Sequence, residues 1–149
     1  MAVHVFDKHA QEGNTLIAQL DREIGDDDPK KAERILKVVL HTLRDRLTIQ
    51  ESFQLMAQFP LFLRGLYASE WKYRSEPLRI RQVEEFIGHA SLHDRSAEKD
   101  FVNTERATFL IKKVFQVVGQ YVSDGQWQDV LDNLPKPLHP LVTPALSAK

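Results

Sequence analysis

The sequence predicts an all-α fold in which two tandem helical repeats, of about four helices each, pack with pseudo-two-fold symmetry into one domain. Apolar residues recur at every third or fourth position through most of the 149 residues, which is typical of amphipathic helices. No segment alternates apolar and polar residues for long enough to predict a strand. Two stretches of equal length, 48–60 and 123–135, both start with a hydroxyl residue and end with an apolar residue and proline.

The first two helices are predicted over residues 6–24 and 29–47. Gly25 follows the first apolar stripe, where a glycine commonly ends a helix. Asp28 is a favourable N-cap residue. Pro29 suits the first helical position, because a backbone N–H would have no helical partner there.

The next two helices are predicted on either side of Pro60. Thr48 and Glu51 indicate a capping box, in which the hydroxyl accepts a bond from the Glu51 N–H and the carboxylate accepts one from the Thr48 N–H. Pro60 disfavours helical geometry at the residue before it, so the first of these helices should end there. A short apolar helix is expected over residues 61–71.

The second half begins with a predicted connection over residues 72–77, and Pro77 is expected to open a helix that extends to Ala90. The polar stretch 91–101 is expected to be a loop with some helical turn. A long amphipathic helix is predicted to start near Asn103.

The end of the chain repeats the earlier pattern. Ser123 and Gln126 predict a second capping box. Several prolines follow, and residues 143–149 are expected to form a mobile tail.

Residues 32–67 align with residues 107–142 without a gap. Apolar character is kept at ten aligned pairs: Leu36/Ile111, Val39/Val114, Leu40/Phe115, Leu43/Val118, Leu47/Val122, Leu55/Val130, Met56/Leu131, Phe59/Leu134, Leu63/Leu138 and Leu66/Leu141. We interpret residues 4–74 and 77–142 as two copies of one unit inside a single domain spanning residues 1–149. The alternative is a pair of unrelated amphipathic helices that share common caps.

Composition excludes several classes of function. The chain has 20 basic and 21 acidic residues, so no global field attracts nucleic acid or an anionic membrane. The apolar runs are too short to cross a bilayer, and the first residues lack the pattern of a signal peptide. The absence of cysteine excludes disulfides, thiolate metal sites and cysteine nucleophiles, and it suits the cytoplasm.

The stretch LHTLRDRLTIQESFQLMAQFPLFLRGLYASEW, residues 40–71, resembles the uncharacterised family catalogued as domain of unknown function 2267. Its matching positions are His41, Leu43, Arg44, Asp45, Arg46, Leu47, Gln58, Pro60, Arg64, Gly65, Tyr67 and Trp71. A looser second motif matches at Val122, Gly125, Asp129, Val130, Leu134, Pro135 and Leu138. Gln126 and Phe59 depart from the pattern, which usually has an acid and a leucine there. The resemblance implies an all-helical, bacterial, cytoplasmic protein, and it implies no activity.

The candidate ligand-binding residues are polar or aromatic positions in the first half that the second half does not repeat: His41, Arg44, Asp45, Arg64, Tyr67 and Trp71. His41 and Asp45 are four residues apart and can share a helix face beside Arg44. Such a group could orient a general base or bind an anion. The alternative is a structural network in which Asp45 pairs with Arg64. No catalytic residue is assigned.

His89 and His93 have the spacing of two metal ligands on one helix, with Asp94 adjacent. Because zinc sites need three or four protein ligands and no third is evident, we predict no metal and no cofactor. Exposed residues at a helix end are the preferred interpretation.

The stretch WKYRSEPLRIR, residues 71–81, interleaves two aromatic residues with Lys72, Arg74, Arg79 and Arg81. Stacking combined with phosphate contacts is typical of single-strand nucleic-acid binding. The balanced charge of the whole chain disfavours this, and Trp71 and Tyr73 could instead cover the boundary between the halves.

No glycine-rich phosphate loop or dinucleotide fingerprint is present. The function predicted first is therefore a non-enzymatic helical module that binds another protein or a second copy of itself. The alternatives are binding of a small molecule or anion, with or without catalysis, and binding of nucleic acid. No membrane association is expected.

Overall fold

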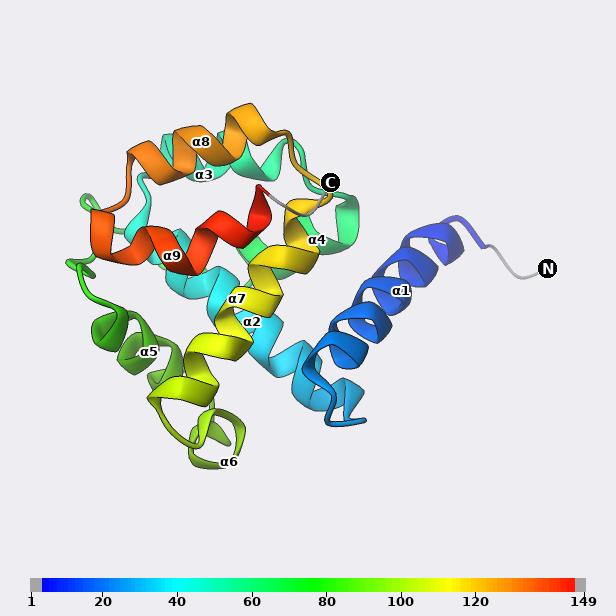
Figure 1. Ribbon diagram of the computed structural model, residues 1–149. Coiled ribbons are helices and arrows are strands. Elements are labelled where there is room, and N and C mark those ends of the chain that lie inside the picture. Colours follow the sequence, from blue (N-terminus) through cyan, green and yellow to red (C-terminus); the bar gives the residue numbers. More distant parts are fainter. Residues whose placement is uncertain (1–3, 147–149) are drawn as a thin grey trace.

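The computed structural model describes residues 4–146, which form nine α-helices and two short 3-10 helices and contain no strand (Figure 1). The predicted all-α fold is confirmed. None of the described helices is long and apolar enough to span a membrane. The elements are α1 (Asp7–Ile24), α2 (Pro29–Arg46), α3 (Ile49–Met56), α4 (Leu61–Ala68), α5 (Val83–Leu92), α6 (Ala97–Phe101), α7 (Thr104–Gly119), α8 (Asp124–Asp132), η1 (Lys136–Leu138), α9 (His139–Val142) and η2 (Thr143–Ala145).

Two long helices, α2 and α7, cross at the centre of the molecule (Figure 1). Helices α1 and α5 each pack on both of them, and α3 and α8 lie side by side at one end. The core between these helices contains large, fully buried side chains such as Trp127, Phe59, Phe86 and Phe115. Each such side chain contributes about 2–3 kcal/mol by leaving water, so the two central helices are held firmly.

Four helix ends form as their sequences predict. Gly25 ends α1 in the left-handed region, with φ of 85°. Asp28 caps α2 by accepting a bond from the Lys31 N–H, and both halves of the Thr48 capping box form at α3. Asn103 caps α7 through the Arg106 N–H. These bonds satisfy backbone donors that the helices themselves leave unpaired.

The second capping box is only half formed. Ser123 accepts a bond from the Gln126 N–H, as expected. The Ser123 N–H, however, donates to Oε1 of Gln58 at 2.7 Å instead of to the Gln126 side chain. The start of α8 is therefore tied to the turn between α3 and α4, a long-range contact that no local pattern indicates.

The prediction that Pro77 opens a helix is wrong. Helix α5 begins at Val83, and residues 71–81 are not helical. The Leu78 N–H donates to the Asp45 carbonyl oxygen at 2.9 Å, and Nε of Arg46 donates to the Ile80 carbonyl oxygen at 3.2 Å. These hydrogen bonds therefore hold the connection between α4 and α5 against the C-terminal end of α2.

Part of the expected mobile tail packs against the core. Residues 143–145 form η2, which lies on α7, and Ala145 is fully buried. The approach is so close that a Cβ atom on Gly119 would meet the Ala145 backbone. Packing therefore continues into residues 143–146, and residues 147–149 lie outside the described part of the chain.

Candidate functional site

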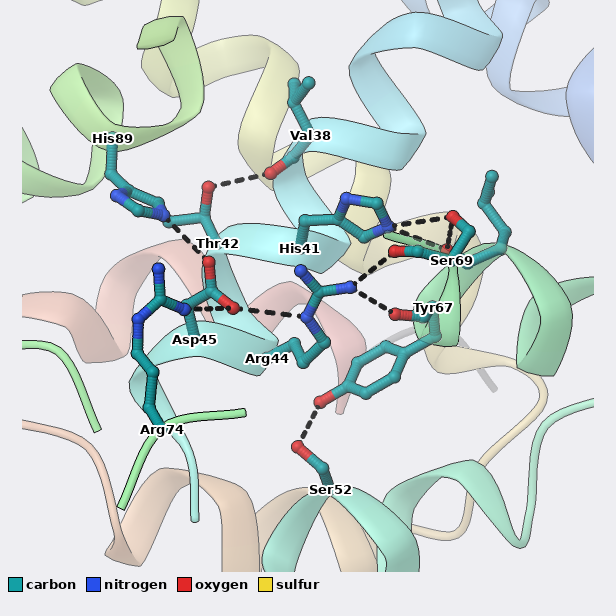
Figure 2. Close-up of polar contacts among 11 residues, drawn as sticks. Val38, His41, Thr42, Arg44, Asp45, Ser52, Tyr67, Ser69, Arg74 and His89 are labelled. Carbon is teal, nitrogen blue, oxygen red and sulfur yellow. Dashed lines mark hydrogen bonds and ion pairs between the residues drawn. The ribbon is translucent and has the colours of Figure 1, made fainter. Parts of the chain in front are cut away.

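The candidate polar residues gather at the C-terminal end of α2, between the end of α4 and α5 (Figure 2). His41, Arg44 and Asp45 are exposed by only 3%, 4% and 5%. Charged groups with so little access to water must find partners within the protein. We call this group, with Ser69, Arg74 and His89, the α2 polar cluster.

Asp45 lies at the centre of the α2 polar cluster. Its Oδ1 accepts from Nε of Arg44 at 3.2 Å and pairs with Nη1 of Arg74 at 3.2 Å. Its Oδ2 accepts from Nε2 of His89 at 3.0 Å. Burial opposes ionisation of this carboxyl group, but the His89 bond and the Arg44 charge outweigh it and lower the pKa of Asp45. Asp45 is therefore a carboxylate at neutral pH.

Arg44 connects α2 to the chain that leaves α4. Its Nη1 donates to the carbonyl oxygens of Tyr67 at 2.9 Å and Ser69 at 2.8 Å. Its Cζ lies 5.4 Å from the centroid of the Trp71 ring, a cation–π distance. The Nη1 group of Arg44 thus holds the chain that follows α4 in place through these carbonyl oxygens.

His41 does not pair with Asp45, although the two residues are four apart on one helix. Its Nε2 donates to the Leu66 carbonyl oxygen at 2.8 Å and lies 3.2 Å from Oγ of Ser69. Burial lowers the pKa of His41, so a neutral imidazole is favoured. The imidazole that contacts Asp45 is that of His89, from α5.

The predicted pairing of Asp45 with Arg64 is wrong. Nε of Arg64 donates to the Phe59 carbonyl oxygen at 2.8 Å, and Nη2 donates to the Ala57 carbonyl oxygen at 3.4 Å. These carbonyl groups follow the end of α3, where helical partners run out. Arg64 therefore stabilises the turn between α3 and α4.

Tyr67 is a core residue. It is fully buried, and its hydroxyl group lies 2.7 Å from Oγ of Ser52. Burial raises the pKa of this phenol well above its ordinary value. Its ring packs edge-on against Trp71, with 6.1 Å between the centroids. Tyr67 thus packs against Trp71 from the core side and is not placed to contact a ligand.

Beside the α2 polar cluster lies a surface groove, which we call the α3 groove. Its polar end has a volume of about 120 Å³ and is lined by Arg44, Asp45, Thr48 and residues 71–77, among others. Its apolar end has a volume of about 230 Å³ and is lined by Ile49, Phe53, Trp71 and Tyr73. Ile49, Trp71 and Tyr73 line both ends, so the two hollows adjoin.

The aromatic residues of the α3 groove differ in exposure. Phe53 is 59% exposed and Tyr73 is 79% exposed, whereas Trp71 is partly buried between them and the core. The Phe53 and Trp71 rings meet edge-on, with 6.1 Å between the centroids. Tyr73 is too exposed to act as a cover for the core, so the structure does not support that role for it.

The four basic residues of the 71–81 stretch do not form one patch. Lys72 and Arg74 line the polar end of the α3 groove, and Arg74 is already paired with Asp45. Arg79 and Arg81 line a different hollow, with Arg46. Within residues 4–146, Lys72, Arg79 and Arg81 form no ion pair.

His89 and His93 are not merely exposed residues at a helix end. The His89 side chain is largely buried against Asp45, and the two imidazole centroids are 4.8 Å apart. The potential ligand atoms of Asp45, His89 and His93 all lie within 4.8 Å of one another. The sequence pattern could not reveal this group, because Asp45 and His89 are 44 residues apart.

A second group of charged residues, which includes buried carboxyl groups, lies near the start of α6, and no sequence pattern indicates it. Nη2 and Nε of Arg34 bond both oxygens of Asp100 at 2.9 and 3.1 Å. Asp94, also buried, is held by the Ser96 N–H at 2.9 Å. Burial, together with the neighbouring Asp100 carboxylate, raises the pKa of Asp94 to about 6.

Residues 13–141 match a family model described as "Uncharacterized conserved protein (DUF2267)". No curated protein matches the chain. The matched residues include both the α2 polar cluster and the α3 groove.

Proposed function

The chain belongs to the family of uncharacterized conserved proteins DUF2267, and we propose that it is a non-enzymatic helical module that binds a partner protein through the α3 groove. The bound element would be an extended segment with an aromatic or long aliphatic side chain next to an acidic residue. The observation that carries the proposal is the pair of exposed rings, Phe53 and Tyr73, which line one apolar hollow with the firmly held Trp71.

The apolar end of the groove favours an apolar anchor. Large aromatic side chains with more than half of their surface in water are unfavourable unless a partner covers them, and such patches commonly mark binding sites. Phe53 and Tyr73 are in this state. Trp71, which lines the same hollow, is fixed by Arg44 and Tyr67, so little ordering is needed when a ligand binds.

The polar end of the groove favours an acidic neighbour. Lys72 has no acidic partner among the described residues, and Arg74 is 35% exposed beside Asp45. Both cations line the polar hollow, which adjoins the apolar one. A carboxylate on the ligand would gain charge-assisted hydrogen bonds there.

The backbone of the groove favours an extended ligand. Residues 71–76 are neither helix nor strand, and they make no backbone hydrogen bond within residues 4–146. Free N–H and C=O groups along such a segment can pair with the main chain of an extended peptide. This supports a peptide over a small molecule.

The α2 polar cluster supports a binding role over catalysis. The hydroxyl groups of Ser52 and Ser69 are bonded to Tyr67 and to the Leu66 carbonyl oxygen. Arg44 and His41 bond backbone carbonyl oxygens of the 66–69 segment. Groups engaged in this way hold the groove in shape.

We also infer that the fold consists of two tandem units with pseudo-two-fold symmetry. Helices α2, α3 and α4 follow one another as α7, α8 and the η1–α9 segment do, and Thr48 and Ser123 both act as N-caps. Aligned core residues, such as Leu43 and Val118, are buried in both halves. Phe53 aligns with Gln128, so the second unit does not repeat the apolar end of the groove.

The proposal is tested by titrating the full chain with a short capped peptide in which glutamates flank one phenylalanine, followed by amide NMR. We expect saturable shifts in the signals of Phe53, Tyr73 and Lys72. The shifts should be lost with Phe53→Ser and kept with Gln128→Ala, the aligned position in the second unit.

Two control peptides test whether binding requires the acidic and the aromatic side chains. One has lysines in place of the glutamates, and the other has alanine in place of phenylalanine. Equal binding of the lysine peptide, or binding that survives Phe53→Ser, would contradict the proposal. A stronger response to inorganic phosphate or to oligothymidylate would favour the anion or nucleic-acid alternative. A mass that rises with protein concentration, without peptide, would favour self-association.

A further inference from the structure

We propose that Asp45, His89 and His93 form a binding site for a divalent metal ion of the zinc class, at the junction of α2 and α5. Asp45 lies in the last turn of α2, His89 lies in the last turn of α5, and His93 is the C-cap residue of α5, which packs on α2. The site adjoins the polar end of the α3 groove, which Asp45 also lines, but the inference does not depend on peptide binding.

The distances are close to those of a metal site. Oδ2 of Asp45 lies 3.0 Å from Nε2 of His89, and the candidate ligand atoms of all three residues lie within 4.8 Å of one another. In a tetrahedral zinc site with bonds of about 2.0–2.2 Å, the donor atoms are about 3.3–3.6 Å apart. His93 must therefore move inward by about 1 Å, which is small for an exposed side chain at a helix end.

The donor atoms fit zinc better than calcium or magnesium. Two imidazole nitrogens and one carboxylate oxygen suit zinc and neighbouring transition metals, whereas calcium and magnesium prefer oxygen ligands. Three protein ligands leave a coordination position for water or another group. The two imidazoles are spaced i, i+4, so they project from the same side of α5.

The neighbours of Asp45 hold its carboxylate in the required orientation. Arg44 and Arg74 both bind Oδ1, which leaves Oδ2 directed at His89 (Figure 2). Such outer contacts commonly fix the orientation of a metal ligand. The same guanidinium charges repel a cation, so Arg74, which is 35% exposed, should reduce the affinity. In a plain hydrogen-bonded network there is no cation for Arg74 to repel. A change in metal affinity when Arg74 is removed therefore distinguishes a metal site from such a network.

The test is calorimetric titration of the chelator-treated, tag-free full chain with zinc chloride, with the visible absorption of bound cobalt as a second readout. We expect one zinc ion per chain. His93→Ala should weaken binding at least tenfold, and Arg74→Ala should tighten it several-fold. His4→Ala removes an exposed imidazole that pairs with Asp7 outside the site, and it should change nothing.

Three results would overturn the proposal: no saturable binding of zinc by the wild-type chain, unchanged affinity in His93→Ala, or equal loss in His4→Ala. Asp45→Asn should also abolish binding, but it removes a buried charge and can disturb folding. His93→Ala changes only an exposed side chain, so its result decides the matter. Circular dichroism of each variant checks that the helices remain.

Discussion

The guanidinium carbon of Arg44 lies 5.4 Å from the centroid of the Trp71 ring. Nη1 of Arg44 also donates to the carbonyl oxygen of Ser69, two residues before Trp71. Arg44 is buried, whereas Trp71 borders the α3 groove. A side chain inside the protein therefore sets the position of a ring at its surface. This relationship connects the α2 polar cluster to the proposed binding site.

Arg44→Met should lower the free energy of unfolding by about 2–4 kcal/mol, because it leaves Asp45 without its buried guanidinium partner and two carbonyl groups without donors. Urea denaturation monitored by circular dichroism measures this change. Arg79→Met is the control, since Arg79 has no ion pair among the described residues; it should change stability by less than about 0.5 kcal/mol. Equal stability of the two variants would show that Arg44 does not hold this region together.

Phe53→Ser should leave the fold intact and remove peptide binding. Because Phe53 is 59% exposed, most of its apolar surface is in water already, and the stability should fall by less than about 1 kcal/mol. Binding of the glutamate-flanked phenylalanine peptide should weaken at least tenfold. A large loss of stability would instead show that Phe53 is part of the core.

Gly119→Ala should destabilise the protein by about 1–3 kcal/mol, because the added Cβ meets the Ala145 backbone and forces η2 away from α7. Gly125→Ala is the matched control, since no atom lies within 4 Å of its added Cβ and α8 gains helix propensity. Thermal unfolding of the two variants gives the comparison. If Gly119→Ala is as stable as the wild type, η2 does not pack on α7 in solution.

Asp94→Asn should stabilise the protein at pH 7 and have little effect near pH 4. The pKa of Asp94 is raised from 3.8 to about 6, so the folded state retains a proton that the unfolded state loses between these values. The Asp94 contribution to stability is therefore present below about pH 4 and is lost as the pH rises through 6. Asparagine keeps a donor toward Asp100 without the charge, and the expected gain at pH 7 is about 1–2 kcal/mol.

Urea denaturation at the two pH values, with a chelator present to exclude metal ions, measures the effect of Asp94→Asn. The lowered pKa of Asp100 acts in the opposite sense, but both proteins retain Asp100. The comparison between them therefore isolates the Asp94 carboxyl group. An increase in the free energy of unfolding that is the same at both pH values would contradict the raised pKa of Asp94.

The sequence predicted features that depend on local chemistry. Helix caps such as Asp28 and Thr48 act within three or four residues of their position, and a single glycine ends α1. Apolar periodicity then identified the core faces of α2 and α7. These signals are local, so one sequence is enough to read them.

The features of the fold and of the site that the sequence did not predict depend on contacts between distant segments. Pro77 has the right chemistry to open a helix, but the Asp45 carbonyl group and Arg46 hold the following residues in a non-helical form. The expected pair of His41 and Asp45 does not form, whereas Arg44 and Asp45, consecutive in the sequence, bond each other. Their partners, His89 and Arg74, lie far away in the sequence, and no spacing rule connects them to α2.

The most direct test of the central claim is selection of a random peptide display library against the full chain, with Phe53→Ser as the counter-target. The account predicts enriched peptides that carry an aromatic or long aliphatic residue beside an acidic one, and that bind Gln128→Ala but not Phe53→Ser. The absence of enrichment, or enriched peptides that bind Phe53→Ser as well as the wild type, would contradict peptide binding by the α3 groove.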